Sequence, residues 1–198
     1  MDKPTKAKPI SKPTIKTRRG YGRKNGKRKI EGKETYFSLL GTNAAGLNPK
    51  RESFFNLINN FKPSVTTVQE TKFSKQGLFK IPGYQIFENV RKNKKGGGLL
   101  TAAIDDTNPV LIHSGSDDNE ILTIQVEVNE NKIRVINAYG PQEDDNTNKI
   151  ISFWQEIESE IIDAKANNCM ILIQLDANAK VGTKHKKKTQ IKCLIMAE

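Results

Sequence analysis

Carboxylates and carboxamides recur in this sequence where short apolar runs stop. The four such ends are Thr42-Asn43, Gln69-Glu70-Thr71, Asn137-Ala138-Tyr139 and Asp176-Ala177-Asn178. The oxygens of Asn43 and Glu70 are hard ligands of the kind that Mg²⁺ prefers, and a site with so few protein ligands leaves room for water and phosphate. These two residues are therefore candidate metal ligands.

Three more side chains at these ends suit the chemistry of a phosphate ester. Asp176 could orient a nucleophilic water, and Asn178 together with the hydroxyl of Tyr139 could hold phosphate oxygens. Asn and Asp after a strand are also common turn formers. Spacing alone therefore leaves both a catalytic and a structural interpretation open.

Other polar features favour structural roles. The Gly96–Gly98 run could be a phosphate cradle, but it lacks a following Gly-Lys-Ser/Thr and leads into an apolar run, which favours a tight turn. His113 stands at the end of an apolar run and is expected to be structural or exposed. Three acidic pairs lie in turn-like segments and are expected to be solvated rather than metal-binding: Asp105-Asp106, Asp117-Asp118 and Asp144-Asp145.

The first scaffold for these residues is a predicted strand–helix–strand unit over residues 35–70. A strand is expected at 36–40, ending at Gly41, and another at 65–69. Between Pro49 and Pro63, the apolar residues follow the i, i+3, i+4, i+7 spacing of a helix face: Phe54, Leu57, Ile58 and Phe61. A strand–helix–strand unit predicts parallel pairing with a crossover.

The middle of the chain is richer in predicted strands, at 84–87, 99–104, 110–112, 121–128 and 133–138. Residues 122–128 alternate between apolar and polar types, as expected of a half-buried antiparallel strand. Asn129-Glu130-Asn131 is expected to form the hairpin turn to the next strand.

The last predicted elements are a helix over 148–166 and a strand over 169–175. Trp154 is expected in the core, on the apolar helix face formed by Ile150, Phe153, Trp154, Ile157 and Ile161. The strand is a continuous apolar run, which predicts burial on both faces. Together these elements predict an α/β protein with a mixed sheet.

Composition excludes several classes of protein. The 198 residues contain two cysteines, too few for a disulfide scaffold, so a reducing compartment and no disulfide-linked partner are expected. No apolar run approaches the ~20 residues that cross a bilayer, and no apolar core follows the basic N-terminus as in a secretory signal. No membrane partner and a nuclear or cytoplasmic location are expected. Two histidines exclude a His-rich metal site.

The formal net charge of +11 is concentrated at the N-terminus. Residues 1–33 hold 13 Lys and Arg against 2 acidic residues, and the rest of the chain holds 20 of each sign. This arm is poor in apolar residues and rich in Pro and Gly, so it is expected to be disordered. Its densest cluster predicts nucleic-acid contact or a nuclear-import signal, with a solubilising arm as the alternative: Arg18, Arg19, Arg23, Lys24, Lys27, Arg28 and Lys29.

Four segments resemble the endonuclease/exonuclease/phosphatase superfamily, in the order and approximate spacing of that family. They are 39–47 (LLGTNAAGL), 68–71 (VQET), 137–141 (NAYGP) and 175–179 (LDANA). The Gly96–Gly98 turn before a strand also fits. The resemblance covers residues 35 to about 183 and is nearest to the apurinic-type endonuclease domain of non-LTR retrotransposons.

This resemblance implies a fold and a site. The fold would be two facing β-sheets with helices outside, as in DNase I-like proteins. Glu70 would be the main ligand of Mg²⁺, with Asn43 supporting the metal or phosphate. Asp176 would align the attacking water, Asn178 would bind phosphate and Tyr139 would help to stabilise the transition state. The reaction would be in-line hydrolysis of a phosphodiester.

The sequence departs from the family in two places that matter for function. Ala45 stands where apurinic enzymes carry a second acidic ligand, and the terminal Ser-Asp-His motif is absent, since His185 has no apolar strand before it. We therefore expect a disordered arm (1–33), the N-terminal part only of a superfamily domain (34–183) and a basic tail (184–198).

Two functions remain open from the sequence. One is a Mg²⁺-dependent, endonuclease-like phosphodiester hydrolase of retrotransposon descent, acting on nucleic acid with DNA as the first choice and impaired by the missing histidine segment. The other is a catalytically inactive fragment that binds nucleic acid through its basic arm.

Overall fold

A computed structural model of the chain describes residues 36–77, 79–91, 96–116, 119–142, 145–178 and 194–196. The chain divides into two units, residues 1–34 and 35–198, and everything described belongs to the second. The expected basic arm, with its Arg18–Lys29 cluster, lies outside the described residues, as do His185 and most of the expected tail. No helix in the described ranges is long and apolar enough to cross a membrane.

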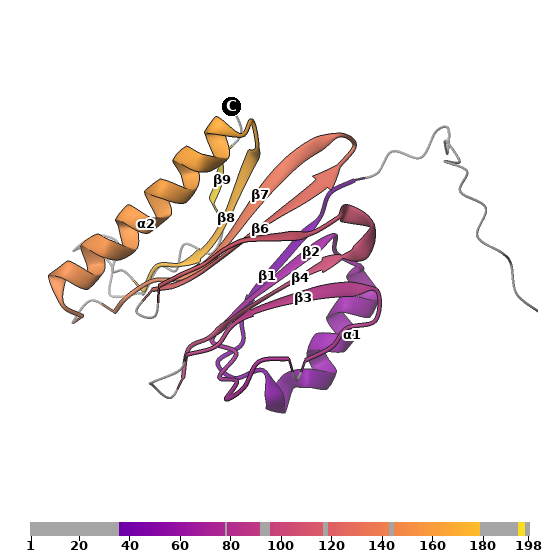
Figure 1. Ribbon diagram of the computed structural model, residues 1–198. Helices are drawn as coiled ribbons and strands as arrows, with labels where there is room; N and C mark the ends of the chain where they lie inside the picture. Colours follow the sequence, from indigo (N-terminus) through magenta and orange to yellow (C-terminus); the bar gives the residue numbers. More distant parts are fainter. Residues whose placement is uncertain are drawn as a thin grey trace, which may run out of the picture. The chain divides into compact units, whose positions relative to one another are not determined.

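The first β-sheet contains four strands in the order β1-β2-β4-β3 (Figure 1). Its strands are β1 (Leu39–Asn43), β2 (Val65–Gln69), β3 (Tyr84–Asn89) and β4 (Leu99–Ile104). β1 and β2 are parallel, with Asn43 beside Gln69, and the other pairs are antiparallel. The crossover between the parallel strands contains a 3₁₀ turn η1 (Asn48–Lys50) and helix α1 (Arg51–Phe61), which confirms the predicted strand–helix–strand unit.

The second sheet contains five strands in the order β5-β6-β7-β8-β9. Its strands are β5 (Val110–Ser114), β6 (Glu120–Val128), β7 (Asn131–Tyr139), β8 (Met170–Asp176) and β9 (Leu194–Met196). β7 and β8 are parallel, with Tyr139 beside Asp176, and helix α2 (Thr147–Ala166) connects them. The remaining element is a 3₁₀ turn, η2 (Asp105–Thr107), between the two sheets in the sequence.

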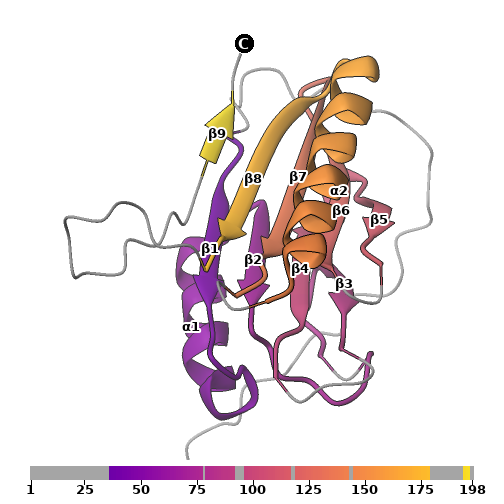
Figure 2. The ribbon, with the colours of Figure 1, turned by 90° about the vertical axis from the view of Figure 1, so that its left-hand side faces the viewer.

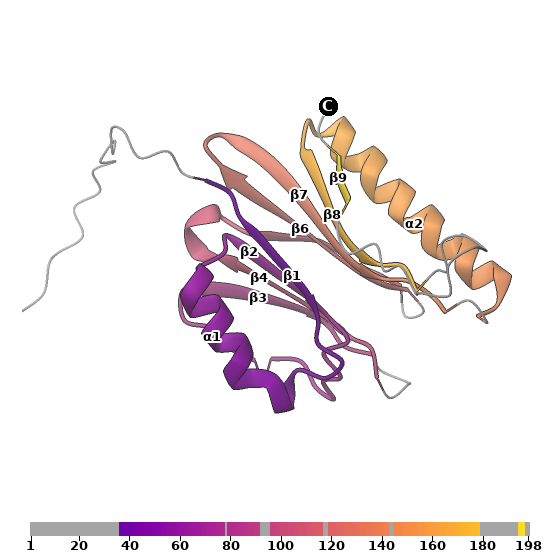
Figure 3. The same ribbon diagram turned by 180° about the vertical axis from the view of Figure 1, so that it is seen from behind.

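The two sheets face each other, with α1 on the outer side of the first and α2 on the outer side of the second (Figures 2 and 3). Three apolar clusters fill the layers. One joins α1 to the first sheet around Phe54 and Leu100, one lies between the sheets around Leu99 and Ile124, and one joins α2 to the second sheet around Phe153. The expected α/β sandwich flanked by helices is therefore observed.

Local sequence explains where the elements start and stop. Pro49 lies in the first turn of η1, and α1 ends at Lys62, which adopts a left-handed conformation with φ of 44° before Pro63. The side chain of Asn146 caps α2 by accepting a hydrogen bond of 2.9 Å from the backbone of Asn148. Asn129 and Glu130 both have positive φ, as a two-residue hairpin turn requires.

Several sequence predictions are corrected by the structure. The first strand covers 39–43 rather than 36–40, so it runs through Gly41 and ends at Asn43. β6 is antiparallel as predicted. Its second half alternates as a half-buried strand should, from buried Val126 to exposed Glu127, whereas residues 120–124 are buried on both faces, with Ile124 in the cluster between the sheets and Ile121 in the cluster under α2. β8 begins at Met170, which is exposed, so its burial on both faces holds only for its inner residues.

The apolar faces predicted for the two helices are also wider than the faces that are buried. Trp154 is 45% exposed and is not a core residue, whereas the adjacent Phe153 is buried under α2. In α1, Phe54 and Ile58 are buried, but Leu57 and Phe61 are exposed. Each helix packs on a sheet along a narrow stripe, so apolar residues at the margin of the predicted face remain in solvent.

Candidate active site

The two parallel strand pairs place the predicted site residues at one end of the sandwich. Asn43 is the last residue of β1 and Glu70 follows β2, while Tyr139 ends β7 and Asp176 ends β8. A hydrogen bond of 2.8 Å between Asn43 and Asp176 joins the two sheets at this end. Residues 133 positions apart in the sequence therefore meet at one site.

The side-chain amide of Asn43 is the centre of this cluster. Its Nδ2 donates to Oε1 of Glu70 and to Oδ2 of Asp176, both at 2.8 Å. Its Oδ1 accepts from the backbone N–H of Ala45 at 3.0 Å, which forms a local turn. The reverse orientation of the amide would point its oxygen at two carboxylates, so the hydrogen bonds fix the orientation.

Tyr139 and Asn178 complete the cluster. The Tyr139 hydroxyl is close enough to the side chains of Asn178 and Glu70 for both to influence its pKa. Asn178 also donates from Nδ2 to the carbonyl of Gly140 at 2.8 Å and from its backbone N–H to Oδ1 of Asp176 at 3.3 Å. Hydrogen bonds thus link four of the five residues that the sequence selected, Asn43, Glu70, Asp176 and Asn178, and Tyr139 lies beside them.

The environment of Tyr139 keeps its hydroxyl protonated. Burial raises the pKa of Tyr139 above its usual 10.0, and the negative charges of Glu70 and Asp176 raise it further. The nearby Asn178 side chain acts in the opposite direction but is outweighed. At neutral pH the hydroxyl is therefore a hydrogen-bond donor.

The backbone around the cluster adopts uncommon conformations that the sheet holds in place. Glu70 and Asn178 have φ of 51° and 49°, in the left-handed region that non-glycine residues rarely adopt. Backbone hydrogen bonds extend beyond β2 on both sides, from Gly46 to Glu70 at 2.8 Å and from Thr71 to Gly98 at 3.0 Å. Such strain persists only where surrounding contacts fix it.

Two buried amides beneath the cluster were not selected by the sequence analysis as site residues. Gln69 Nε2 donates to Asn137 Oδ1 at 2.8 Å, and Asn137 Nδ2 donates to the carbonyl of Leu100 at 3.0 Å. Gln69 precedes Glu70, and Asn137 lies two residues before Tyr139. This bridge fixes the two sheets to each other directly under the site. The available signal was their position, because both amides stand in the strand-end segments that also contain Glu70 and Tyr139.

The oxygens of this cluster fit a hard divalent cation. Mg²⁺ needs only one or two carboxylates because it keeps several of its waters, and here one amide holds two carboxylates together. The described residues contain no group of three His, Cys, Asp or Glu side chains that could form a protein-only cage. Lys72 Nζ lies 3.8 Å from Glu70 Oε2 and is half-exposed, so it can move away from that oxygen.

The other polar features of the sequence have structural roles. Gly96–Gly98 forms a tight turn in which all three glycines have positive φ, as expected. His113 is half-buried and contacts Glu156, with 2.6 Å between Nε2 and Oε1, so it joins β5 to α2. Burial raises the pKa of Glu156, but hydrogen bonds from Asn119, His113 and Ser116 outweigh it and lower the pKa overall. Asp105-Asp106 is exposed, and Asp117-Asp118 lies outside the described residues.

The sequence matches no protein-family model and no curated protein. The structure, however, is similar to solved structures that include NExo, TDP2 and the TRAS1 endonuclease domain. The 3′-5′ exonuclease NExo from Neisseria meningitidis is 17% identical with a TM-score of 0.58, covering 73% of this chain and 59% of NExo. A second NExo structure (D146N), 19% identical with a TM-score of 0.56, covers 72% of this chain and 58% of NExo and is bound to a product DNA hairpin.

The other two relatives have similar scores. TDP2 from Caenorhabditis elegans is 13% identical with a TM-score of 0.56, covering 76% of this chain and 51% of TDP2. The endonuclease domain of TRAS1, a telomere-specific non-LTR retrotransposon, is 16% identical with a TM-score of 0.57, covering 74% of this chain and 61% of that domain. The chain thus spans between half and two thirds of these solved chains. At these identities the comparisons show the fold alone, a DNase I-like sandwich of two sheets flanked by helices.

Proposed function

We propose that this chain is a phosphodiester hydrolase that uses a divalent cation, with Mg²⁺ as the first choice, and acts on nucleic acid as an endonuclease of retrotransposon descent. The observation that carries the proposal is the hydrogen-bonded cluster of Asn43, Glu70, Asp176 and Asn178, with Tyr139 beside it, at the joined ends of two parallel strand pairs. The shared fold with NExo, TDP2 and the TRAS1 domain supports it, and the DNA hairpin in NExo supports a nucleic-acid substrate.

Each residue has a role that follows from its position. Glu70 would hold the cation, and Asn43 would fix the Glu70 and Asp176 carboxylates relative to each other. When bound, the cation supplies positive charge that offsets the charge on the phosphate oxygens. Asp176 is only 4% exposed and is held by Asn43, so its carboxylate is fixed to orient a water for in-line attack.

The remaining two residues would act on the phosphate. The protonated Tyr139 hydroxyl can donate a hydrogen bond to a phosphate oxygen that gains charge in the transition state. Asn178 presents an amide beside the same hydroxyl and would bind another phosphate oxygen. Residues 1–198 contain no Ser-Asp-His motif, which would supply one further group that stabilises charge, so we expect slow turnover by these residues assayed alone.

The test is nicking of a supercoiled plasmid in Mg²⁺ and in EDTA. Glu70→Gln and Asp176→Asn should each lower the Mg²⁺-dependent rate by about 10²–10³ or to background, because each removes a charged group from the reacting centre. The matched controls are Glu127→Gln and Asp106→Asn, which change exposed carboxylates elsewhere. Calorimetric titration with Mg²⁺ gives a second measurement, in which only Glu70→Gln should weaken binding strongly.

Two outcomes would contradict the proposal. Nicking that persists in both site variants would show that other residues or a contaminant cut the plasmid. A wild-type chain that binds no Mg²⁺ and does not nick would favour the second candidate, a catalytically inactive protein that binds nucleic acid through its basic arm. That candidate is favoured by the missing Ser-Asp-His motif and by the concentration of positive charge in residues 1–33.

A further inference from the structure

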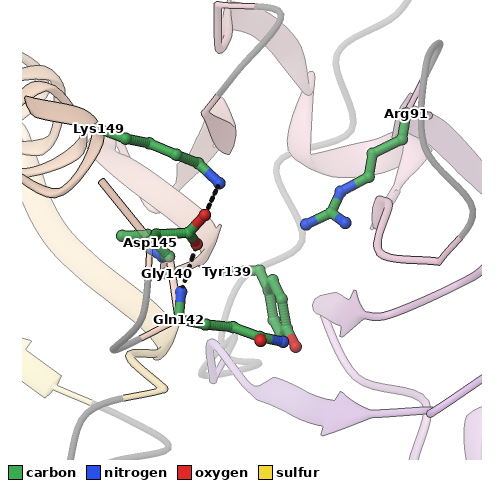
Figure 4. A pocket seen from close by; sticks show the side chains of 7 residues that line it. Arg91, Tyr139, Gly140, Gln142, Asp145 and Lys149 are labelled. Atoms are coloured by element: carbon green, nitrogen blue, oxygen red, sulfur yellow. Dashed lines mark hydrogen bonds and ion pairs between the residues drawn. The ribbon is translucent and has the colours of Figure 1, made fainter. Parts of the chain in front are cut away.

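A polar pocket of about 180 Å³ lies beside the candidate site and shares Tyr139 with it. Figure 4 shows Arg91 and Lys149 extending toward this pocket from different elements, with Tyr139 and Gln142 between them. Lys149 belongs to the first turn of α2, and Arg91 lies just after β3. Two cationic side chains from distant parts of the sequence therefore meet at one pocket.

Arg91 is held in place by a buried carboxylate. Its guanidinium pairs with Oε1 of Glu120, whose side chain is only 7% exposed, while that of Arg91 remains 30% exposed. The backbone N–H of Gly98 donates to the other oxygen of Glu120. A side chain at Gly97 would collide with Arg91 and Glu120, so the glycine turn is what admits this ion pair.

Burying a carboxylate in this way is costly for the fold. Burial raises the pKa of Glu120, and the contacts with Gly98 and Arg91 offset this only in part. A partly exposed surface arginine gains little stability from such a pair. The arrangement does, however, hold the planar guanidinium in one orientation with N–H groups left over for an oxyanion.

The charges at the pocket suit a single phosphate. Arg91 and Lys149 supply two positive charges, and one carboxylate of the lining, Asp145, accepts from Lys149 at 3.0 Å and from the backbone N–H of Gln142 at 2.7 Å. Lys149 is about a quarter exposed, so it can turn from Asp145 toward a bound anion. The pocket borders Tyr139, so such an anion would lie next to the reacting phosphate.

We propose that this pocket binds a backbone phosphate of the nucleic-acid strand next to the scissile phosphate, with Arg91 and Lys149 as contacts and Glu120 as a positioning residue for Arg91. The proposal rests on the proposed function for the identity of the ligand. Binding at the pocket needs neither metal nor hydrolysis, so it can be measured separately from them.

The test is an NMR titration of the full chain in EDTA with single-stranded tetrathymidylate, following the backbone N–H of Gln142 and Gly140. The wild-type resonances should shift, and the dissociation constant read from them should rise about tenfold in Arg91→Gln, the loss expected for one hydrogen bond to a charged group. Lys149→Gln should also weaken binding, whereas Lys165→Gln, in the last turn of the same helix, should not. A local readout is needed because the basic arm can bind the same ligand elsewhere.

Glu120→Gln tests the positioning role. It should weaken binding as much as Arg91→Gln does, and the double variant should be no weaker than either single variant, because Glu120 acts only through Arg91. Full affinity in Glu120→Gln would overturn this role. If Glu120→Gln fails to melt cooperatively, Arg91→Lys tests whether the fixed orientation of the guanidinium matters. This variant keeps the positive charge but loses the planar guanidinium, so it should bind tetrathymidylate more weakly than the wild type does.

Ligand controls identify the anion. The uncharged methylphosphonate analogue of the tetranucleotide should cause no shift at Gln142. Inorganic phosphate binding as tightly as the strand would overturn the assignment to a nucleic-acid backbone, and unchanged affinity in both Arg91→Gln and Lys149→Gln would overturn the site. Glu70→Gln should retain pocket binding, so loss of nicking in that variant concerns the proposed function and not this pocket.

Discussion

At the scale of single residues, Tyr139 is the group whose protonation the site controls most clearly. Its raised pKa means that the neutral hydroxyl is present throughout the neutral range, and its contribution to stability is lost only as the pH rises through that raised value, above 10.0. Tyr139→Phe should therefore lower the Mg²⁺-dependent nicking rate by a similar factor, about tenfold or more, at every pH from about 6 to 9.

The same variant should leave the melting temperature at neutral pH nearly unchanged, because the phenyl ring keeps the packing of Tyr139. Thermal melts from pH 7 to 11 would check this: the wild-type chain should lose stability above pH 10, and Tyr139→Phe should lose less. The role of Tyr139 as a neutral donor would be contradicted if Tyr139→Phe nicked DNA as fast as the wild type at neutral pH. It would also be contradicted if the two rates differed only at alkaline pH.

Ala45 carries strain that a substitution can relieve. Ala45 has a φ of 48° in an exposed turn. In this left-handed conformation the Cβ atom costs about 1–2 kcal/mol through steric contact, whereas glycine costs about 0.5–1 kcal/mol through the conformational entropy that it loses on folding. Ala45→Gly should therefore raise the free energy of unfolding slightly, by about 0.5 kcal/mol, in urea titrations. Ala166→Gly, at the exposed end of α2, should instead lower it, and equal effects of the two variants would contradict the strain.

Residue types at strand ends made the five residues of the site candidates, because parallel strands bring their carboxyl ends together, but spacing alone left a structural interpretation open and the family resemblance was needed to choose. The hydrogen bonds were not predictable at this scale. Asn43 was expected to support the metal or phosphate, and the structure shows its amide holding two carboxylates instead of facing outward. The ion pair between Arg91 and Glu120 could not be predicted from the residues next to either of them in the sequence. It depends on the turn at Gly97, six residues after Arg91.

At the scale of elements, the buried amides Gln69 and Asn137 connect the two sheets beneath the site. Removing one partner leaves the other without its hydrogen bond in the core, so Gln69→Leu and Asn137→Leu should each cost about 1–3 kcal/mol. The double variant should cost less than the sum of the two, because no orphaned amide remains. Urea unfolding measures all three values.

The control for this cycle is Gln85→Leu, an exposed strand glutamine that should change stability by less than about 0.5 kcal/mol. Strict additivity of Gln69→Leu and Asn137→Leu would show that the two amides do not depend on each other. Loss of Mg²⁺ affinity in either single variant, without unfolding, would further show that the bridge positions Glu70 and Tyr139.

Strands and helices were predictable as elements because their apolar periodicity is strong, and the turn at Asn129-Glu130 was predictable from its residue types. The burial of individual side chains on these strands and helices was less predictable. Trp154 and Phe61 lie on apolar helix faces, yet only a narrow stripe of each helix is buried against its sheet, and both side chains remain exposed. Conversely, Thr123 is polar and fully buried, because α2 covers the side of β6 that alternation assigned to solvent.

At the scale of the whole molecule, the net positive charge and the candidate active site lie in different parts of the sequence. The excess of 11 positive charges in residues 1–33 accounts for the whole net charge of the chain, while the remaining residues are balanced. The candidate site contains two carboxylates, and its neighbouring pocket would take only one phosphate. Affinity for a long nucleic acid should therefore come mainly from the arm, and position on the strand from the folded part.

This leads to a prediction about salt. Removing residues 1–33, or replacing them with a neutral Gly/Ser segment of equal length, should remove most of the affinity for duplex DNA at about 50 mM salt, because each lost phosphate contact removes the release of its counterions. The slope of log affinity against log salt should be steep for the full chain and near that of a single contact for the shortened one. Fluorescence anisotropy over about 50–200 mM salt gives both quantities. If residues 34–198 kept most of the affinity, the folded part would hold a larger binding surface than the pocket at Arg91 and Lys149, and the arm would be a solubilising segment.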